Sequence, residues 1–246
     1  VIIVPYMNYP AFRAAKRISP VDGLNMNRIF PGKPNGTVTE KIADYFLNRL
    51  IPLADIVLDY HSGGKSLDFI PFAAAHLLED KTQEAACIAA MEAFGAPYSM
   101  TLKEIDPTGM YDTAVEEAGK IFVSTELGGG GSATARSAGI ARRGAENILR
   151  HAGILEGEPI GTGTTRIDTT GGDCFHFSPS DGMLEMLFDL ADEVAAGDTI
   201  ARIWPLDGSG KKPSKVISNE TGILAARHFP GLIKLGDCLA VVAVTQ

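Results

Sequence analysis

The sequence predicts an α/β domain followed by a small all-β domain. Apolar strands alternate with amphipathic helices over residues 1–153, a pattern typical of an α/β sheet. From Asp173 onward, short β-prone runs at glycine-rich intervals replace the helical pattern. Between these parts, residues 154–172 carry Gly, Thr and Pro without periodicity, which indicates a linker. We therefore expect domains at residues 1–160 and 170–246.

The first domain is expected to open with a strand at Val1–Val4, which has four β-prone residues in succession. Because the chain begins inside this run and without Met, we expect an N-terminal segment of the protein to precede it. A long Pro- and Gly-containing loop follows over residues 19–36. Thr37 and Glu40 then have the spacing of a capping box, and apolar residues at helical spacing predict a helix up to Leu50.

The same patterns predict the later elements. In the first domain, strands are expected at residues 55–60 and 120–125, and helices at residues 80–94 and 133–151. Gly95 and Gly153 follow the two helices, as glycines commonly do at helix ends. In the second domain, strands are expected at residues 182–186, 198–203, 222–226 and 238–244.

The composition excludes several classes of function. The 246 residues carry a net charge of −8 and no basic stripe, which excludes a nucleic-acid-binding protein. The apolar run Leu239–Val244 is much shorter than the ~20 residues of a membrane-spanning helix, so no membrane partner is expected. Cys87, Cys174 and Cys238 form no C-x-x-C pair, which indicates a protein of the reducing cytoplasm. The sequence does not decide the oligomeric state, which can be a monomer or a homo-oligomer.

Two predicted strands end in candidate catalytic or metal-binding residues. His61 and Glu126 each follow an apolar strand and each precede glycines. Because ligands bind outside the carboxyl ends of strands in open α/β sheets, we expect both side chains at one crevice. The pair suits a metal ligand with a general base, or an acid–base pair. Asp59 shares a strand face with His61 and is expected to orient its imidazole. The alternative is that His61 is a hydrogen-bonded histidine of a turn and Glu126 a carboxylate at a helix terminus.

The loop from Arg17 to Gly32 carries groups that bind anions. Arg28 offers a planar fork that matches a carboxylate, and the neighbouring Asn27 adds an amide donor and acceptor. These residues favour a small anionic substrate, such as the carboxylate of an amino acid. A loop stabilised by its own Asx turns is the alternative.

Three ordered motifs carry a family resemblance: D-G-x-N-M-N-R-x-F-P-G at residues 22–32, D-x-H-S-G-G at 59–64 and T-E-L-G-G-G-G at 125–131. The sequence resembles the succinylglutamate desuccinylase/aspartoacylase family, zinc-dependent hydrolases of carboxypeptidase A-like fold. This implies a mixed sheet flanked by helices and a lipoyl- or barrel-sandwich-like C-terminal domain. It also implies hydrolysis of the amide bond of an N-acyl amino acid. Within the family, the sequence looks similar to N-acetyl-diaminobutyrate deacetylases of ectoine breakdown.

The resemblance also implies roles for individual residues. His61 matches the third ligand of one Zn²⁺ ion, and Glu126 matches the catalytic carboxylate. The other two ligands, an H-x-x-E pair, precede the opening strand in the family and are expected to lie outside this sequence. The sequence does contain one H-x-x-E, at His76–Glu79, but it follows His61, and we expect it to be a coincidental match.

The substrate-binding residues follow from the same match. Asn27 and Arg28 match the pair that binds the substrate carboxylate, Arg17 matches an arginine that stabilises the oxyanion, and Tyr111 matches a tyrosine that lines the site. The preference for an acetyl, aspartate-type or succinyl substrate stays open.

Two other functions remain as alternatives. Residues Gly128–Ala133 fit G-x-G-x-x-A between a strand and a helix, a weak dinucleotide-binding fingerprint. If the protein begins at Val1, the same residues predict an inactive carboxylate-binding module, because a catalytic zinc site needs three protein ligands.

Overall fold

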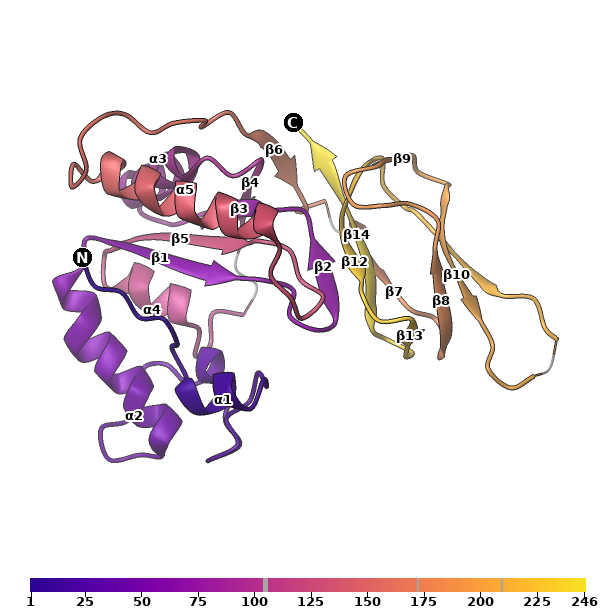
Figure 1. Cartoon of the computed structure of the whole chain (residues 1–246), viewed down its shortest axis with the longest axis horizontal. Helices are drawn as coiled ribbons and strands as arrows, with labels where there is room; N and C mark the ends of the chain where they lie inside the picture. Colours follow the sequence, from indigo (N-terminus) through magenta and orange to yellow (C-terminus); the bar gives the residue numbers. More distant parts are fainter. Residues whose placement is uncertain (104–105, 172, 209) are drawn as a thin grey trace. The chain divides into compact units, whose positions relative to one another are not determined.

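The computed structural model describes residues 1–103, 106–171, 173–208 and 210–246 (Figure 1). The chain forms two compact units. The first contains Val1–Leu58, Leu78–Cys87 and Glu104–Phe122, and the second contains Asp59–Leu77, Ile88–Lys103 and Val123–Gln246. The expected domains at residues 1–160 and 170–246 stay a prediction.

The described helices are α1 (Tyr9–Arg13), α2 (Val38–Tyr45), α3 (Lys81–Phe94), α4 (Tyr111–Glu117) and α5 (Ala135–His151), with short helical segments η1 (Met26–Arg28), η2 (Phe46–Leu50) and η3 (Ile51–Leu53). The described strands are β1 (Ile56–His61), β2 (Leu67–Phe69), β3 (Phe72–His76), β4 (Tyr98–Leu102), β5 (Ile121–Glu126), β6 (Thr165–Asp168), β7 (Phe175–Phe177), β8 (Gly182–Met186), β9 (Glu193–Val194), β10 (Thr199–Trp204), β11 (Ser214–Ile217), β12 (Gly222–His228), β13 (Leu232–Ile233) and β14 (Cys238–Thr245).

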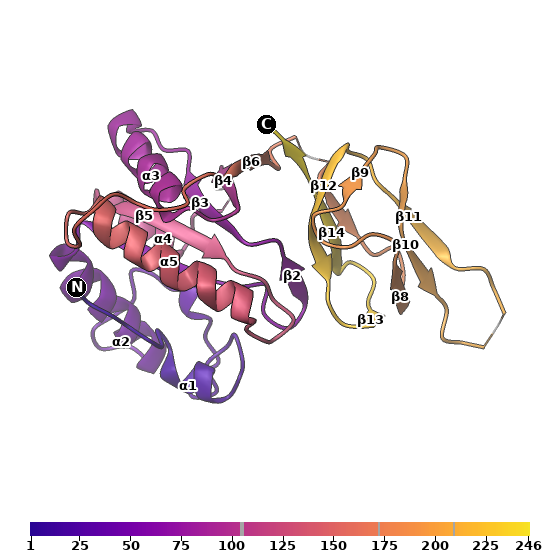
Figure 2. The same cartoon turned by 45° about the horizontal axis from the view of Figure 1, so that its top comes forward.

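The main sheet is mixed, which confirms the predicted fold class. Eight of its strands follow the order β1-β5-β3-β4-β6-β14-β12-β2, and β7 pairs with β14 and β9 with β12. Strand β4 runs parallel to β3 and β6, whereas β5 is antiparallel to β3. The long antiparallel pair of β12 and β14 lies side by side in both views (Figures 1 and 2). Strands β11-β10-β8-β13 form a second sheet, so the C-terminal part is all-β as expected.

Two sequence-based expectations about elements are wrong. Val1–Val4 lies outside any strand and is exposed, because β propensity does not form a strand without a partner for the backbone groups. Residues 154–172 are only partly a linker, because β6 pairs with β4 on one side and with β14 on the other.

An aromatic cluster in the first unit supports the loop that carries Asn27 and Arg28. The ring of Tyr111 contacts the rings of Phe30, Phe46 and Phe122, with centroid separations of 5.1 to 5.9 Å. Aromatic pairs at such distances add to the stabilisation from apolar burial. The loop and the first turn of α4 are therefore anchored to one core.

Asp22 anchors the same loop to α2. Its Oδ2 accepts a hydrogen bond from the Thr39 backbone N at 2.7 Å, and its Oδ1 accepts one from Thr39 Oγ1 at 2.8 Å. Burial by itself would raise the pKa of Asp22, but the hydrogen bonds from Thr39, Thr37 and Leu24 lower it from 3.8 to about 2.

This lowered pKa predicts a pH dependence of stability. The stabilisation from ionised Asp22 should be fully present above about pH 4, and it should be lost as the pH falls through about 2. The variant Asp22→Asn should be less stable than the wild type at pH 7, and the difference should shrink toward pH 2. Urea unfolding of both proteins between pH 7 and pH 2 measures the difference in free energy of unfolding. A difference that does not change with pH would contradict the stabilising role of ionised Asp22.

In the second unit, a buried asparagine joins α5 to its surroundings. Asn147 donates from Nδ2 to the carbonyl oxygens of Phe94 and Ile160 and accepts at Oδ1 from Ile160 N at 2.8 Å. Gly144 allows close packing here, because a Cβ at that position would meet the Phe94 ring at 2.1 Å. No helix in the described part of the chain combines the length and apolar character that a membrane span requires.

Candidate active site

His61 and Asp59 form a contact pair at the end of β1. Nε2 of His61 lies 2.7 Å from Oδ2 of Asp59, as their shared strand face predicted. The intervening Tyr60 donates from its hydroxyl to the carbonyl oxygen of Ala141 on α5. A carboxylate on one nitrogen of an imidazole fixes the tautomer and the orientation of the ring.

Glu126 ends β5, the strand next to β1. The backbone N of Leu127 donates to the His61 carbonyl oxygen at 3.1 Å, so the two strand ends lie side by side. Oε2 of Glu126 has less than 1 Å² of exposed surface. The structure thus places the ends of the strands that carry His61 and Glu126 side by side, whereas the position of both side chains at one crevice stays a prediction.

Thr125 was not predicted from the sequence as part of the site. Its Oγ1 accepts a hydrogen bond from the His61 backbone N at 3.4 Å, which links the two strands at the position of the histidine. A signal was present, because Thr125 directly precedes Glu126 in the motif that carries the resemblance.

Backbone hydrogen bonds join the loop after His61 to the glycine loop, residues 128–131, which follows Glu126. The Gly63 N donates to the Gly128 carbonyl at 2.9 Å, and Gly130 N donates to the Leu67 carbonyl at 3.1 Å. The Gly131 N donates to the carbonyl of Gly64. A dinucleotide-binding loop needs free backbone amides to bind the phosphates. Because the amides of Gly130 and Gly131 are bound to carbonyl oxygens, the dinucleotide-binding alternative is disfavoured.

The other predicted site residues lie in the first unit. Asn27 accepts at Oδ1 from the Tyr111 backbone N at 2.6 Å, a bond that fixes the orientation of its amide group. Arg28 is exposed, and its guanidinium contacts the Asn27 carbonyl and the Met110 sulfur. Asn25 accepts at Oδ1 from Asn27 N at 3.2 Å, so the predicted Asx turn is present beside the anion-binding groups.

Tyr111 and Arg17 have contrasting environments. Tyr111 is 8% exposed, and its ring belongs to the aromatic cluster, so its role in lining a substrate site stays a prediction. Arg17 is exposed on a bend after α1, and its role at the oxyanion also stays a prediction.

The residues fit part of a zinc site. The His61–Asp59 pair has the form of a metal-ligating histidine with its outer carboxylate. Within the described ranges, no three His, Cys, Asp or Glu side chains come together in a way that could hold a metal ion. In the H-x-x-E match, His76 is buried at the end of β3 and Glu79 is exposed.

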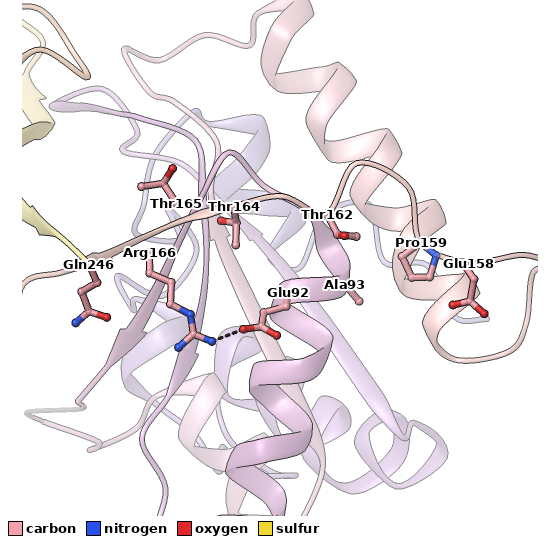
Figure 3. Close-up of a pocket in the computed structure, with 9 residues that line it drawn as sticks. All are labelled: Glu92, Ala93, Glu158, Pro159, Thr162, Thr164, Thr165, Arg166 and Gln246. Atoms are coloured by element: carbon pink, nitrogen blue, oxygen red, sulfur yellow. Dashed lines mark hydrogen bonds and ion pairs between the residues drawn. The ribbon is translucent and has the colours of Figure 1, made fainter.

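A separate pocket in the second unit has a volume of about 790 Å³ (Figure 3). An ion pair between Arg166 of β6 and Glu92 of α3 crosses its lining. None of the predicted site residues lines this pocket.

Comparison with known proteins identifies the family. Residues 1–152 match the family described as "Succinylglutamate desuccinylase/Aspartoacylase catalytic domain". The chain belongs to this family. The predicted resemblance is therefore confirmed, and so is the prediction of an enzyme that hydrolyses N-acyl amino acids.

Several relatives in the succinylglutamate desuccinylase/aspartoacylase family match almost the whole chain. The N-alpha-acetyl-L-2,4-diaminobutyric acid deacetylase of Halomonas elongata is 49% identical over 245 residues, which cover 99% of this chain and 72% of the relative. The product-bound ectoine utilization protein EutE (DoeB) of Ruegeria pomeroyi is 60% identical with a TM-score of 0.95. A succinylglutamate desuccinylase of Silicibacter sp. TM1040 is 57% identical with a TM-score of 0.96. Both structural matches cover 99% of this chain and 74% of the relative.

Proposed function

We propose that the protein hydrolyses N-α-acetyl-L-2,4-diaminobutyrate to acetate and 2,4-diaminobutyrate. The observation that carries this proposal is the side-by-side position of the strand ends that carry His61 and Glu126. The specificity is supported by the names of the relatives from Halomonas elongata and Ruegeria pomeroyi, and the reaction would belong to ectoine breakdown. Desuccinylase or aspartoacylase specificity is the second candidate, because the Silicibacter relative carries a desuccinylase name.

A zinc ion is proposed as the cofactor, with His61 as one of its ligands. The carboxylate of Asp59 would hold the imidazole of His61 in a fixed orientation for the metal. For the two remaining ligands, the family resemblance implies an H-x-x-E pair. When bound, zinc polarises a carbonyl and lowers the pKa of water.

Glu126 is proposed as the general base and acid. Its carboxylate accepts a proton from the water whose oxygen attacks the acyl carbon. The same carboxyl then donates that proton to the nitrogen as the carbon–nitrogen bond breaks. This leaves the free amine and acetic acid, which releases its remaining proton to give acetate. The low exposure of Oε2 keeps bulk water from competing for this proton.

The loop of the first unit is proposed to bind the substrate carboxylate. Arg28 supplies two parallel N–H donors and Asn27 supplies Nδ2, whose direction is set by the bond from Tyr111 N to Oδ1. Arg17 is proposed to stabilise the oxyanion, and Tyr111 to support the site from the core.

A comparison of three substrates tests this function. Release of carboxylate and primary amine would be measured for the full-length protein with N-α-acetyl-L-2,4-diaminobutyrate, N-acetyl-aspartate and N-succinyl-glutamate, before and after removal of metal with a chelator. We expect the highest kcat/KM with the first substrate and loss of turnover after metal removal. A preference for either other substrate would overturn the specificity. Binding without turnover of any substrate would favour an inactive carboxylate-binding module.

The outer carboxylate of the metal ligand gives a further prediction. The variant Asp59→Asn should weaken zinc binding about tenfold, because a neutral amide holds the imidazole less firmly and makes it a weaker base. Competition with a chromophoric chelator measures this affinity. Asp189→Asn, at an exposed carboxylate far from His61 in the sequence, serves as the control, and equal affinities for the two variants would contradict the role of Asp59.

A further inference from the structure

An aromatic side chain from the C-terminal β structure covers the glycine loop that follows Glu126. Phe229 lies in the turn between β12 and β13. A Cβ placed on Gly130 would lie 2.6 Å from Cε2 and 2.8 Å from Cζ of the Phe229 ring. The ring therefore sits directly against the Gly130 backbone, which only a glycine allows at this distance. Gly130 also has a φ of +66°, in the left-handed region that favours glycine.

Phe229 also contacts the loop that follows His61. Its backbone N donates to the carbonyl oxygen of Ser66 at 2.8 Å. One residue of the turn thus touches both loops, with the ring against one and the main chain bound to the other.

The two loops are coupled to each other and to the strand ends. Gly130 N donates to the Leu67 carbonyl, next to Ser66, and Leu127 N donates to the His61 carbonyl. A shift of the glycine loop would therefore move the backbone that immediately follows Glu126.

The turn that carries Phe229 is held in place by contacts of the neighbouring residues of β12. His228 pairs with Leu67 in the antiparallel ladder between β12 and β2. The buried His228 also contacts the Leu232 carbonyl oxygen through Nε2 at 3.1 Å, which closes the turn. An ion pair between Arg227 and Asp68, at 4.0 Å, lies on the next rung.

We propose that Phe229 is a positioning residue for the reaction, which fixes the glycine loop and through it the carboxylate of Glu126. This inference rests on the proposed role of Glu126. Phe229 is 51% exposed, so removal of its ring takes little apolar area from the core. Its effect on the reaction should therefore exceed its effect on the free energy of unfolding.

The variant Phe229→Ala tests this position. We expect kcat to fall about tenfold with KM within about twofold of wild type, because small displacements of a catalytic group are costly to the rate. Phe229→Tyr, which keeps the ring, should restore kcat. Phe177→Ala is the matched control, because Phe177 is 57% exposed on β7 of the same C-terminal part.

Hydrogen exchange provides a readout that does not depend on turnover. The amides of Gly130 and Gly131 should exchange faster in Phe229→Ala than in Phe177→Ala, because the covering ring is gone. Wild-type kcat and exchange in Phe229→Ala would overturn the proposal, as would an equal loss of kcat in both alanine variants. If Glu126→Gln is fully active, the proposed function fails, whereas an inactive Glu126→Gln with an unaffected Phe229→Ala refutes only the role of Phe229.

Discussion

Replacement of Glu126 by glutamine should lower kcat about 1,000-fold, the middle of the range for loss of a general acid–base group. Glutamine keeps the shape of the side chain but cannot accept the proton of the attacking water. Because Glu126 is not proposed as a metal ligand, zinc content should stay at the wild-type level. Steady-state kinetics and metal analysis of the same preparation measure the two quantities together.

A matched substitution separates this effect from a general loss of charge. Glu146→Gln removes an exposed carboxylate that pairs with Arg150 on α5, and it should keep wild-type kinetics. Near-wild-type kcat in Glu126→Gln would remove Glu126 from the mechanism. Loss of zinc from that variant would instead assign Glu126 to the metal.

Replacement of Arg28 by alanine should raise KM about 100-fold and change kcat much less. The lost fork of hydrogen bonds to a carboxylate is worth about 3 kcal/mol, and these bonds are expected in the ground state and transition state alike. Arg28→Lys should have an intermediate KM, because an ammonium binds a carboxylate as a point charge. Arg49→Ala, at an exposed arginine of η2, is the control.

A substrate analogue makes this prediction specific to the carboxylate. When the substrate carboxylate is replaced by a primary amide, the wild type should lose affinity, and Arg28→Ala should lose little more. An equal penalty for Arg28→Ala with both substrates would show that Arg28 does not bind the carboxylate.

Local signals in the sequence predicted much of the α/β framework. The capping box at Thr37 and Glu40 is present, with Thr37 N donating to Glu40 Oε2 at 2.8 Å. Gly95 and Gly153 have φ values of 72° and 70°, as expected for glycines that end helices. These signals succeed because each depends on residues within one turn of a helix.

Strand β3 shows where such signals fail. Its sequence Phe-Ala-Ala-Ala-His has helix-favouring alanines, and no strand was expected at Phe72–His76. In the structure all five residues are buried, and the strand pairs with β4 on one side and β5 on the other. Pairing on both edges outweighs the local preference, and both partners are distant in the sequence.

In the candidate site, too, some features follow from local sequence patterns and others from tertiary contacts. The sequence by itself determined the family, the ends of the strands that carry His61 and Glu126, and the contact of Asp59 with the imidazole, since each follows from a motif or from strand periodicity. Only the tertiary structure decided that the amide of Gly130 is bound to the Leu67 carbonyl and that the Phe229 ring covers this glycine. The physical reason is that these contacts arise where β12 pairs with β2, and no local pattern of side chains encodes a pairing between such distant segments.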